Sequence, residues 1–336
     1  MHDPSSMVPS RKQVHGDLSG TLDFFFKDPG ATAFPPLESP FTEKLLERIP
    51  ADHPQREHAF RFAREGYTVL DVGIPDFDRV ASRIIRNLAP RYPEGDRRVQ
   101  EAWAFDADVR ALACNARILE LLQFLYQREP IPFQTLNFDL GTEQATHSDV
   151  LHFYSHPPRY MCGVWVALED MDASNGPLHY YPGSHKLPDY DLNDLGMARG
   201  FEDYARYEHF IAALARVHGL ERRELHVKKG HALIWAANLL HGGSPVVDPA
   251  RTRHSQVTHY FFANCVWMTP GDSDLPIGRP HLREVIDLKT GRFVPPIYHG
   301  QRVDLSKFAN VYRYPRPLPD WVEQDGQARA AGAGTS

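Results

Sequence analysis

The sequence has few cysteines, and their arrangement excludes two common uses. Among 336 residues only Cys114, Cys162 and Cys265 are cysteine, an odd number spread far apart. A disulfide framework needs an even set of cysteines, and a cysteine zinc site needs closely spaced pairs. The sequence therefore predicts neither a disulfide scaffold nor a cysteine metal site, and it favours a reducing, cytoplasmic location.

Long apolar runs and basic runs are also missing. No stretch approaches the roughly 18 consecutive apolar residues of a membrane span, and residues 1–20 show no apolar core of a secretion signal. The formal net charge is −6, and no Lys/Arg-rich run with interleaved aromatic residues is present. We therefore expect no nucleic-acid partner and no membrane; the pattern leaves the oligomeric state open.

The composition is that of a folded domain. Hydrophobic residues make up 42% of the chain and charged residues 24%, which is enough for a sizeable core. Residues 1–20 lack periodicity and predict a disordered tail, as do residues 321–336, which end in GQARAAGAGTS. Few linker-like segments interrupt residues 21–320, so we expect a single domain there.

Apolar spacing and turn residues predict the elements of this domain. Helices are expected over residues 57–65, 76–88 and 106–127, and an amphipathic helix over 201–217 is expected to cover a sheet. Short β-prone runs at close spacing indicate a mainly β fold with flanking helices, a jelly roll with its core at about residues 131–265. The runs are FQTLNFDL, LHFY, MCGVWVALE, LHYYP, ELHVKKG, HALIWA and SQVTHYFF.

The first candidate for chemistry is the segment His147-Ser148-Asp149. Two side chains separated by one residue on an extended segment project to the same side and can bind one metal ion together. The pattern is weak alone, because the chain has 18 histidines and the tail segment His15-Gly16-Asp17 matches it by chance. A pair of this kind is more often a surface pair.

A third ligand strengthens the metal hypothesis. The run from Gly230 to Pro245 is typical of a buried strand that ends in His241 on a Gly-Gly turn. Two histidines and one carboxylate on one face of an iron ion leave three coordination positions open, which is the arrangement of non-haem Fe(II) oxygenases. We therefore predict His147, Asp149 and His241 as iron ligands.

Arg253 and Ser255 are candidates for binding a co-substrate. The planar guanidinium of Arg253 suits the distal carboxylate of 2-oxoglutarate, and Ser255 has the same strand parity and could add a hydroxyl. The alternative is that Arg253 belongs only to the charged turn 248–254.

Two further residues are weighed from strand parity. Trp165 alternates with Gly163 and Ala167, whose small side chains leave room for a ligand, although an ordinary core tryptophan is the alternative. Gln134 and Asn137 lie at opposite parity, so at most one faces the site. We favour Asn137 because Gln134 alternates with apolar residues. The remaining histidines, including His152 and His259, are predicted to have no role in chemistry.

Taken together, these pieces resemble the phytanoyl-CoA dioxygenase family over roughly residues 57–265. The resemblance implies a double-stranded β-helix, Fe(II) bound by His147, Asp149 and His241, 2-oxoglutarate bound by Arg253, and Trp165 as the wall beside the cofactor. Residues 1–56 and 266–336 match nothing in the family. In chain order the pieces are His147-Ser-Asp149, Trp165 in GVWVALED, Asn175-Gly-Pro-Leu, Tyr181-Pro-Gly-Ser-His-Lys186, Leu240-His241-Gly-Gly-Ser-Pro245 and Arg253.

The resemblance implies a dioxygenase that uses O2 and 2-oxoglutarate to hydroxylate a C–H bond of a small molecule, with release of succinate and CO2. Halogenating relatives lack the carboxylate ligand, so Asp149 argues against halogenation. Two alternatives stay open: a non-catalytic jelly-roll metal-binding or sensor protein, and a cupin-like metal isomerase or lyase. No glycine-rich phosphate cradle or Lys/Arg cluster singles out coenzyme A, and a small polar metabolite is the expected substrate.

Overall fold

The computed structural model describes residues 34–93 and 97–322, and all of these fall within one compact unit. The predicted N-terminal tail, with its His15-Gly16-Asp17 segment, lies outside the described residues, as does most of the predicted C-terminal tail. None of the helices in this described part is both long enough and apolar enough to span a bilayer.

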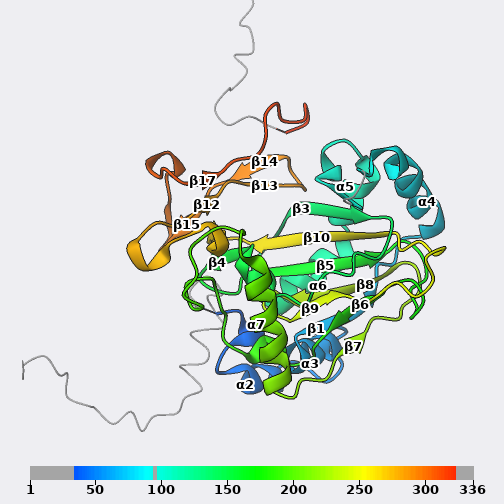
Figure 1. Cartoon of the computed structure of the whole chain (residues 1–336), viewed down its shortest axis with the longest axis horizontal. Helices are drawn as coiled ribbons and strands as arrows, with labels where there is room; N and C mark the ends of the chain where they lie inside the picture. The colour runs from blue at the N-terminus through cyan, green and yellow to red at the C-terminus, as the bar shows by residue number, and fades with distance from the viewer. Residues whose placement is uncertain (1–33, 94–96, 323–336) are drawn as a thin grey trace, which may run out of the picture. The chain divides into compact units, whose positions relative to one another are not determined.

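The centre of the fold is a six-stranded antiparallel sheet (Figure 1). Its two central strands are rich in β-branched and aromatic residues and are buried along their whole length, so both faces of the sheet are covered there. In spatial order the strands are β1 Tyr67–Asp71, β8 His231–Ala236, β5 Met161–Ala167, β10 Ser255–Phe262, β3 Pro130–Phe138 and β2 Arg98–Gln100.

A smaller sheet faces the large one. It contains β7 Arg223–Glu224, β6 Leu178–Tyr180 and β9 His241–Gly243. One core cluster joins residues of β6 to the residues of the large sheet that face it, including Trp165, Leu233 and Trp235. The opposite face of the large sheet packs on helices in a second, larger cluster. Two packed antiparallel sheets with helices outside confirm the predicted mainly β, jelly-roll fold.

The helices differ from the sequence predictions in several places. A short helix, α2 Thr42–Glu47, was not predicted. The first two predicted helices are present as α3 Arg56–Glu65, which Gly66 ends in the left-handed conformation at φ 80°, and α4 Phe77–Leu88. The single helix predicted over 106–127 is instead two helices, α5 Ala107–Ala113 and α6 Ala116–Tyr126. Asn115 causes the break, because its side chain accepts a hydrogen bond from the Ile118 N–H and caps a new helix.

The amphipathic helix predicted at 201–217 is α7 Tyr204–Val217, but it does not cover the sheet. Its buried residues Tyr207 and Ile211 form a cluster with Leu151 and Leu240, which belong to loops outside the strands. Figure 1 shows α7 drawn in front of the strands. The helix therefore packs on a loop residue shortly after Asp149 and on the one that precedes His241.

Two of the predicted strands are shorter than expected, and residues beyond 265 form small sheets that were not predicted. The run LHFY is mostly a turn, and its strand, β4 Tyr154–His156, begins only at its last residue. The predicted strand ELHVKKG is reduced to β7 and a single bridge at Val227. Sheet β17-β12-β11-β4 contains β11 Val266–Met268, β12 Leu282–Arg283 and β17 Val311–Tyr312; two hairpins pair β13 Val285–Asp287 with β14 Arg292–Val294 and β15 Ile297–Tyr298 with β16 Gln301–Arg302.

Candidate metal centre and the cavity around it

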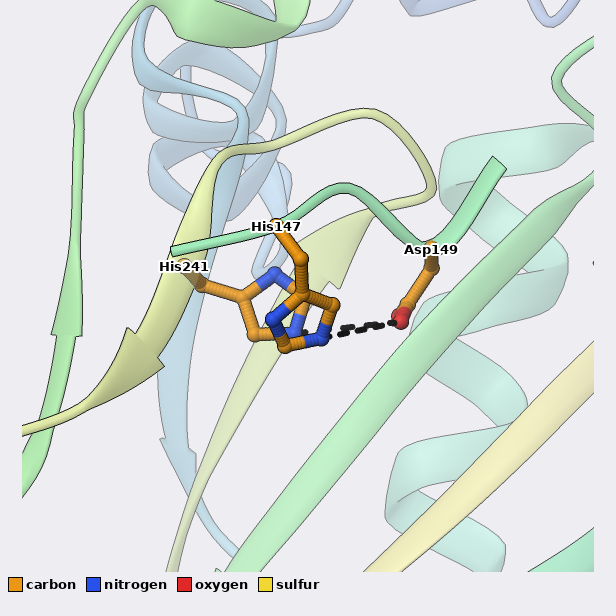
Figure 2. A group of neighbouring side chains, drawn as sticks. All are labelled: His147, Asp149 and His241. Atoms are coloured by element: carbon orange, nitrogen blue, oxygen red, sulfur yellow. Dashed lines mark ion pairs between the residues drawn. The ribbon is translucent and has the colours of Figure 1, made fainter. Parts of the chain in front are cut away.

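His147, Asp149 and His241, the predicted metal ligands, point toward one another (Figure 2). His147 and His241 form a β-bridge in which each backbone N–H donates to the carbonyl of the other, at 2.9 and 3.1 Å. Oδ1 of Asp149 lies 3.7 Å from Nε2 of His147 and 3.9 Å from Nε2 of His241. The three ligand atoms lie within 4.8 Å of one another, and all three residues are buried, so they could bind one metal ion.

The backbone that positions Asp149 differs from the predicted extended segment. Ser148 is extended, with φ −122° and ψ 136°, but Asp149 is the first residue of a 3-10 turn, Asp149–Leu151. The amides of His152 and Phe153 donate to the Asp149 carbonyl at 2.9 and 2.8 Å and close this turn. The carboxylate therefore reaches the histidines from a turn, and strand parity was the wrong reason for placing it there.

Backbone carbonyls orient the two imidazole rings. Nδ1 of His147 lies 3.0 Å from the Ala145 carbonyl, and Nδ1 of His241 lies 2.9 Å from the Leu239 carbonyl. A carbonyl oxygen can only accept, so each Nδ1 carries the proton and each Nε2 keeps its lone pair. Both rings thus present Nε2 to the space between the three residues, as metal-binding histidines commonly do.

Asp149 is held by a tryptophan of the large sheet. Nε1 of Trp235 donates to Oδ2 of Asp149 at 2.8 Å, which leaves Oδ1 for the two histidines. Gly163 makes room for the indole, because a Cβ at this position would lie 2.1 Å from the Trp235 ring. The small residue and the tryptophan are register partners on β5 and β8.

The pKa shifts of His147 and Asp149 favour the protonation states that bind a cation. Burial lowers the pKa of His147 to about 3, helped by the neighbouring His241, so this ring is neutral at pH 7. Burial raises the pKa of Asp149, but the neighbouring His241, His259 and His147 rings and the hydrogen bond from Trp235 outweigh it and hold the pKa below its ordinary value. A neutral imidazole beside an ionised carboxylate is the protonation state that metal binding requires.

The three residues line one end of a cavity of about 460 Å³ between the two sheets. Arg253 lines it as well, with Nη1 donating to the Gly176 carbonyl at 3.2 Å. Burial lowers the pKa of Arg253 to about 10, so the guanidinium is still charged at pH 7.

Three buried polar atoms of the predicted co-substrate residues have no partner among the described residues. They are Nε of Arg253, Oγ of Ser255 and Nε1 of Trp165. Ser255 shares its face of the chain with Arg253 and with the cavity-lining Val257, whose register partner on β5 is Trp165. Buried donors are normally satisfied, and a carboxylate bound between the sheets could satisfy these. Arg253 and Trp165 thus bring buried donors without a partner in the described residues to the cavity wall, whereas Ser255 is not among the lining residues.

Asn137, which was predicted to bind the co-substrate, does not line the cavity. Its amide lies 3.4 Å from Oε1 of Gln256 and is buried on the other face of the sheet. The cavity is instead lined by Gln134, Leu136 and Phe138. The alternation of Gln134 with apolar residues was the reason for favouring Asn137, but apolar side chains commonly line ligand cavities, and here they mark the cavity side.

Several cavity residues were missed. His259 lines the cavity, although we expected a structural histidine, and its parity with Arg253 was an available signal. His152 closes the cavity on the side of α7, where its ring stacks on Phe201 at 5.2 Å and 12° and its Nε2 lies 3.2 Å from the Tyr204 hydroxyl. No sequence pattern indicates this contact, because the residues lie about 50 positions apart in loops and at a helix start.

Comparisons with known proteins agree with these observations. A model of the phytanoyl-CoA dioxygenase family matches residues 71–255. The phytanoyl-CoA dioxygenase domain-containing protein 1 of Danio rerio is 46% identical over 141 residues, which cover 38% of this chain and 43% of that protein. Phytanoyl-CoA dioxygenase 1 of Oryza sativa subsp. japonica is 26% identical over 167 residues, 48% of this chain and 56% of that one.

These matches cover part of each protein. The matched segments span between 30% and 56% of the length of the first curated relatives. Among solved structures, the non-haem α-ketoglutarate-dependent carbocyclase SnoK from nogalamycin biosynthesis is similar with a TM-score of 0.53 and 15% identity, over 77% of this chain and 95% of that one. At this identity the likeness concerns the fold alone.

Proposed function

The chain belongs to the phytanoyl-CoA dioxygenase family, and from that premise we propose that it is an Fe(II)- and 2-oxoglutarate-dependent oxygenase acting on a small molecule in the cytoplasm. The observation that carries the proposal is the buried set His147, Asp149 and His241 beside the cavity-lining Arg253. Two histidines and one carboxylate leave three positions open on a bound iron ion. The proposal treats residues 21–320 as one catalytic domain.

The residues present fit both groups. Nε2 of His147, Oδ1 of Asp149 and Nε2 of His241 would hold the iron. The partnerless Nε of Arg253, with the Ser255 hydroxyl and the Trp165 Nε1, would hold the distal carboxylate of 2-oxoglutarate. When bound, iron and 2-oxoglutarate together supply the activation of O2, with succinate and CO2 as by-products.

The chain's own contribution is positioning and exclusion of water. Trp235 orients the carboxylate that would hold the metal, and the apolar Leu136 and Phe138 line part of the cavity wall. The stacked pair His152 and Phe201 lines the side toward α7. A preorganised cavity keeps the reacting groups in place, and the apolar part of its wall limits side reactions with water.

We propose that the reaction is hydroxylation of a C–H bond. The carboxylate of Asp149 occupies the position that halogenating relatives leave open for chloride, which supports oxygen transfer over halogenation. The similar solved structure is named a carbocyclase, so the fold alone does not select the outcome. Mass spectrometry of the product tests this step: hydroxylation adds one oxygen atom to the substrate, whereas cyclisation removes two hydrogens.

The cofactor chemistry is tested without a substrate. Anaerobic addition of Fe(II) and 2-oxoglutarate to the purified protein should give a weak visible charge-transfer band. His241→Ala should abolish the band, and Arg253→Ala should raise the 2-oxoglutarate concentration for half saturation at least about tenfold, because a charge-assisted hydrogen bond is lost. Arg251→Ala, which removes a partly exposed arginine of the same turn, is the matched control and should leave the band unchanged.

The absence of the band from well-folded protein would contradict the proposal. In that case the site would be a metal site without 2-oxoglutarate chemistry, as in a metal-binding protein or a metal isomerase. An equal loss of 2-oxoglutarate affinity in Arg251→Ala and Arg253→Ala would remove the specific role of Arg253.

A further inference from the structure

A third histidine stands beside the candidate metal centre without belonging to the ligand set. Nε2 of His259 lies 3.8 Å from Oδ2 of Asp149, whereas the two candidate ligands face Oδ1 of the same carboxylate. The His259 ring is buried, lines the cavity and packs against Phe153 with ring centroids 4.6 Å apart. Its ring nitrogen therefore faces the same space as the reacting groups.

The surroundings of His259 fix which ring nitrogen carries the proton. Nδ1 lies 2.9 Å from Oε1 of Gln134. Glu101 orients the side-chain amide of Gln134, because the amide N–H of Gln134 donates to the buried Glu101 carboxylate. Nε1 of Trp103 donates to the same carboxylate. Oε1 of Gln134 can only accept, so in the neutral ring Nδ1 of His259 donates and Nε2 keeps its lone pair.

Two hydrogen-bond acceptors, Nε2 of His259 and Oδ2 of Asp149, thus face each other at the cavity wall. A separation of 3.8 Å is too long for a hydrogen bond between them, and neither atom has a proton to donate. Oδ2 of Asp149 accepts from Trp235 and has capacity for one more donor. A single donor atom about 2.8 Å from each acceptor fits the gap and would relieve the repulsion between the two lone pairs.

We propose that His259 Nε2 and Asp149 Oδ2 form a subsite for a hydroxyl or N–H group of the substrate. This inference rests on the proposed function and deepens it, because it assigns the substrate a donor group beside the carbon that is oxidised. A site built to accept a hydrogen bond rejects an analogue that lacks the donor, since the buried Nε2 of His259 is then left unpaired. Methyl ethers should therefore bind about tenfold to a hundredfold more weakly than the matching alcohols.

The subsite is tested by nitrogen NMR of the protein with Zn(II) in place of iron. Zinc has no redox chemistry, so the complex with 2-oxoglutarate cannot turn over. Long-range proton–nitrogen spectra report which ring nitrogen is protonated, and the signals lost in His259→Phe identify this ring. Propane-1,2-diol and 1,2-dimethoxypropane serve as probes, because they share a carbon skeleton and differ in hydrogen-bond donors.

We expect a proton on Nδ1 of His259 and a shift of its Nε2 signal with the diol but not with the ether. His185, a buried histidine bonded to the Ala63 carbonyl, is the internal control and should not respond to either probe. Gln134→Leu should weaken the diol response, because it removes the acceptor that fixes the ring. A proton on Nε2, or a diol response no larger than the ether response, overturns the proposal.

The test is separate from that of the cofactor chemistry. If the charge-transfer band forms with Fe(II) and 2-oxoglutarate but the diol leaves Nε2 unmoved, only the subsite is wrong. If the band does not form, the proposed function is wrong, and a diol-specific response would then describe a binding site without that reaction.

Discussion

At the scale of single residues, Trp235 connects the sheet to the candidate metal centre. Its indole makes the hydrogen bond that leaves Oδ1 of Asp149 for the metal. We expect Trp235→Phe to lower the affinity for Fe(II) about 10- to 100-fold, as is typical when a residue that orients a metal ligand is lost. Anaerobic Fe(II) or Co(II) titrations measure this.

The matched control for this substitution is Trp267→Phe. Trp267 is also fully buried, but its Nε1 has no partner among the described residues. This substitution removes a similar volume without removing a contact to Asp149, so metal affinity should be retained. Equal losses in the two variants would show that packing, and not the hydrogen bond, sets the affinity.

The sequence predicted which residues come together at the candidate metal centre. It did not predict which face of strand β3 lies toward the cavity. His147, Asp149, His241 and Arg253 could be found because their chemical types and their places near turns are visible in the chain. Asn137 was wrongly placed because the side of β3 that faces the cavity depends on tertiary packing. The register of β3 against β10 also shifts between His259 and Tyr260, which no alternation pattern shows.

At the scale of elements, the pairing of β5 with β8 depends on a glycine. A Cβ at Gly163 would overlap the Trp235 ring, so Gly163→Ala must displace the indole. We expect a loss of about 1–3 kcal/mol in the free energy of unfolding, measured by urea titration, together with weaker metal binding. Because Phe is smaller than Trp, the cost of Gly163→Ala should fall in a Trp235→Phe background. Additive costs would indicate that the two side chains do not interact.

Helix prediction failed where two helices share one apolar face. Val109 and Leu112 of α5 pack in the same cluster as Leu121 and Leu122 of α6, so the apolar spacing continues across the break. The signal for the break was Asn115, a good capping residue, which we read as part of a continuous helix. The position of α7 over the ligand-bearing loops could not be predicted, because amphipathic spacing gives a buried face but not what covers it.

At the scale of the whole described unit, residues 266–322 support the cavity from outside. Trp267, Ile286 and Tyr314 belong to the same core cluster as the helices behind the large sheet. The guanidinium of Arg283 lies 5.0 Å from the ring of Phe153, which lines the cavity. The sequence gave no sign of this, because strands of two or three residues are too short to show periodicity.

The start of the described chain carries a carboxyl group that should make stability depend on pH. The side chain of Glu38 is fully buried, 3.5 Å from Arg159, which also pairs with Asp189 at 3.2 Å. Burial raises the pKa of Glu38 from 4.5 to about 8, against the opposing charge of Arg159. A raised pKa means that folding favours the protonated form, so this contribution is complete below pH 4.5 and is lost as the pH rises through about 8.

Glu38→Gln should remove this loss, because the amide keeps the shape of the protonated carboxyl without its titration. The free energy of unfolding of the variant, relative to that of the wild type, should therefore increase by about 2 kcal/mol between about pH 5 and about pH 8.5. This is less than the full pKa difference would give, because an ionised Glu38 can shift toward Arg159. Urea unfolding at several pH values measures this difference, in which the other titrating groups largely cancel. Glu43→Gln, at an exposed position nearby, is the control and should show a constant difference. A constant difference for Glu38→Gln as well would mean that Glu38 is already ionised at pH 5 in the folded protein.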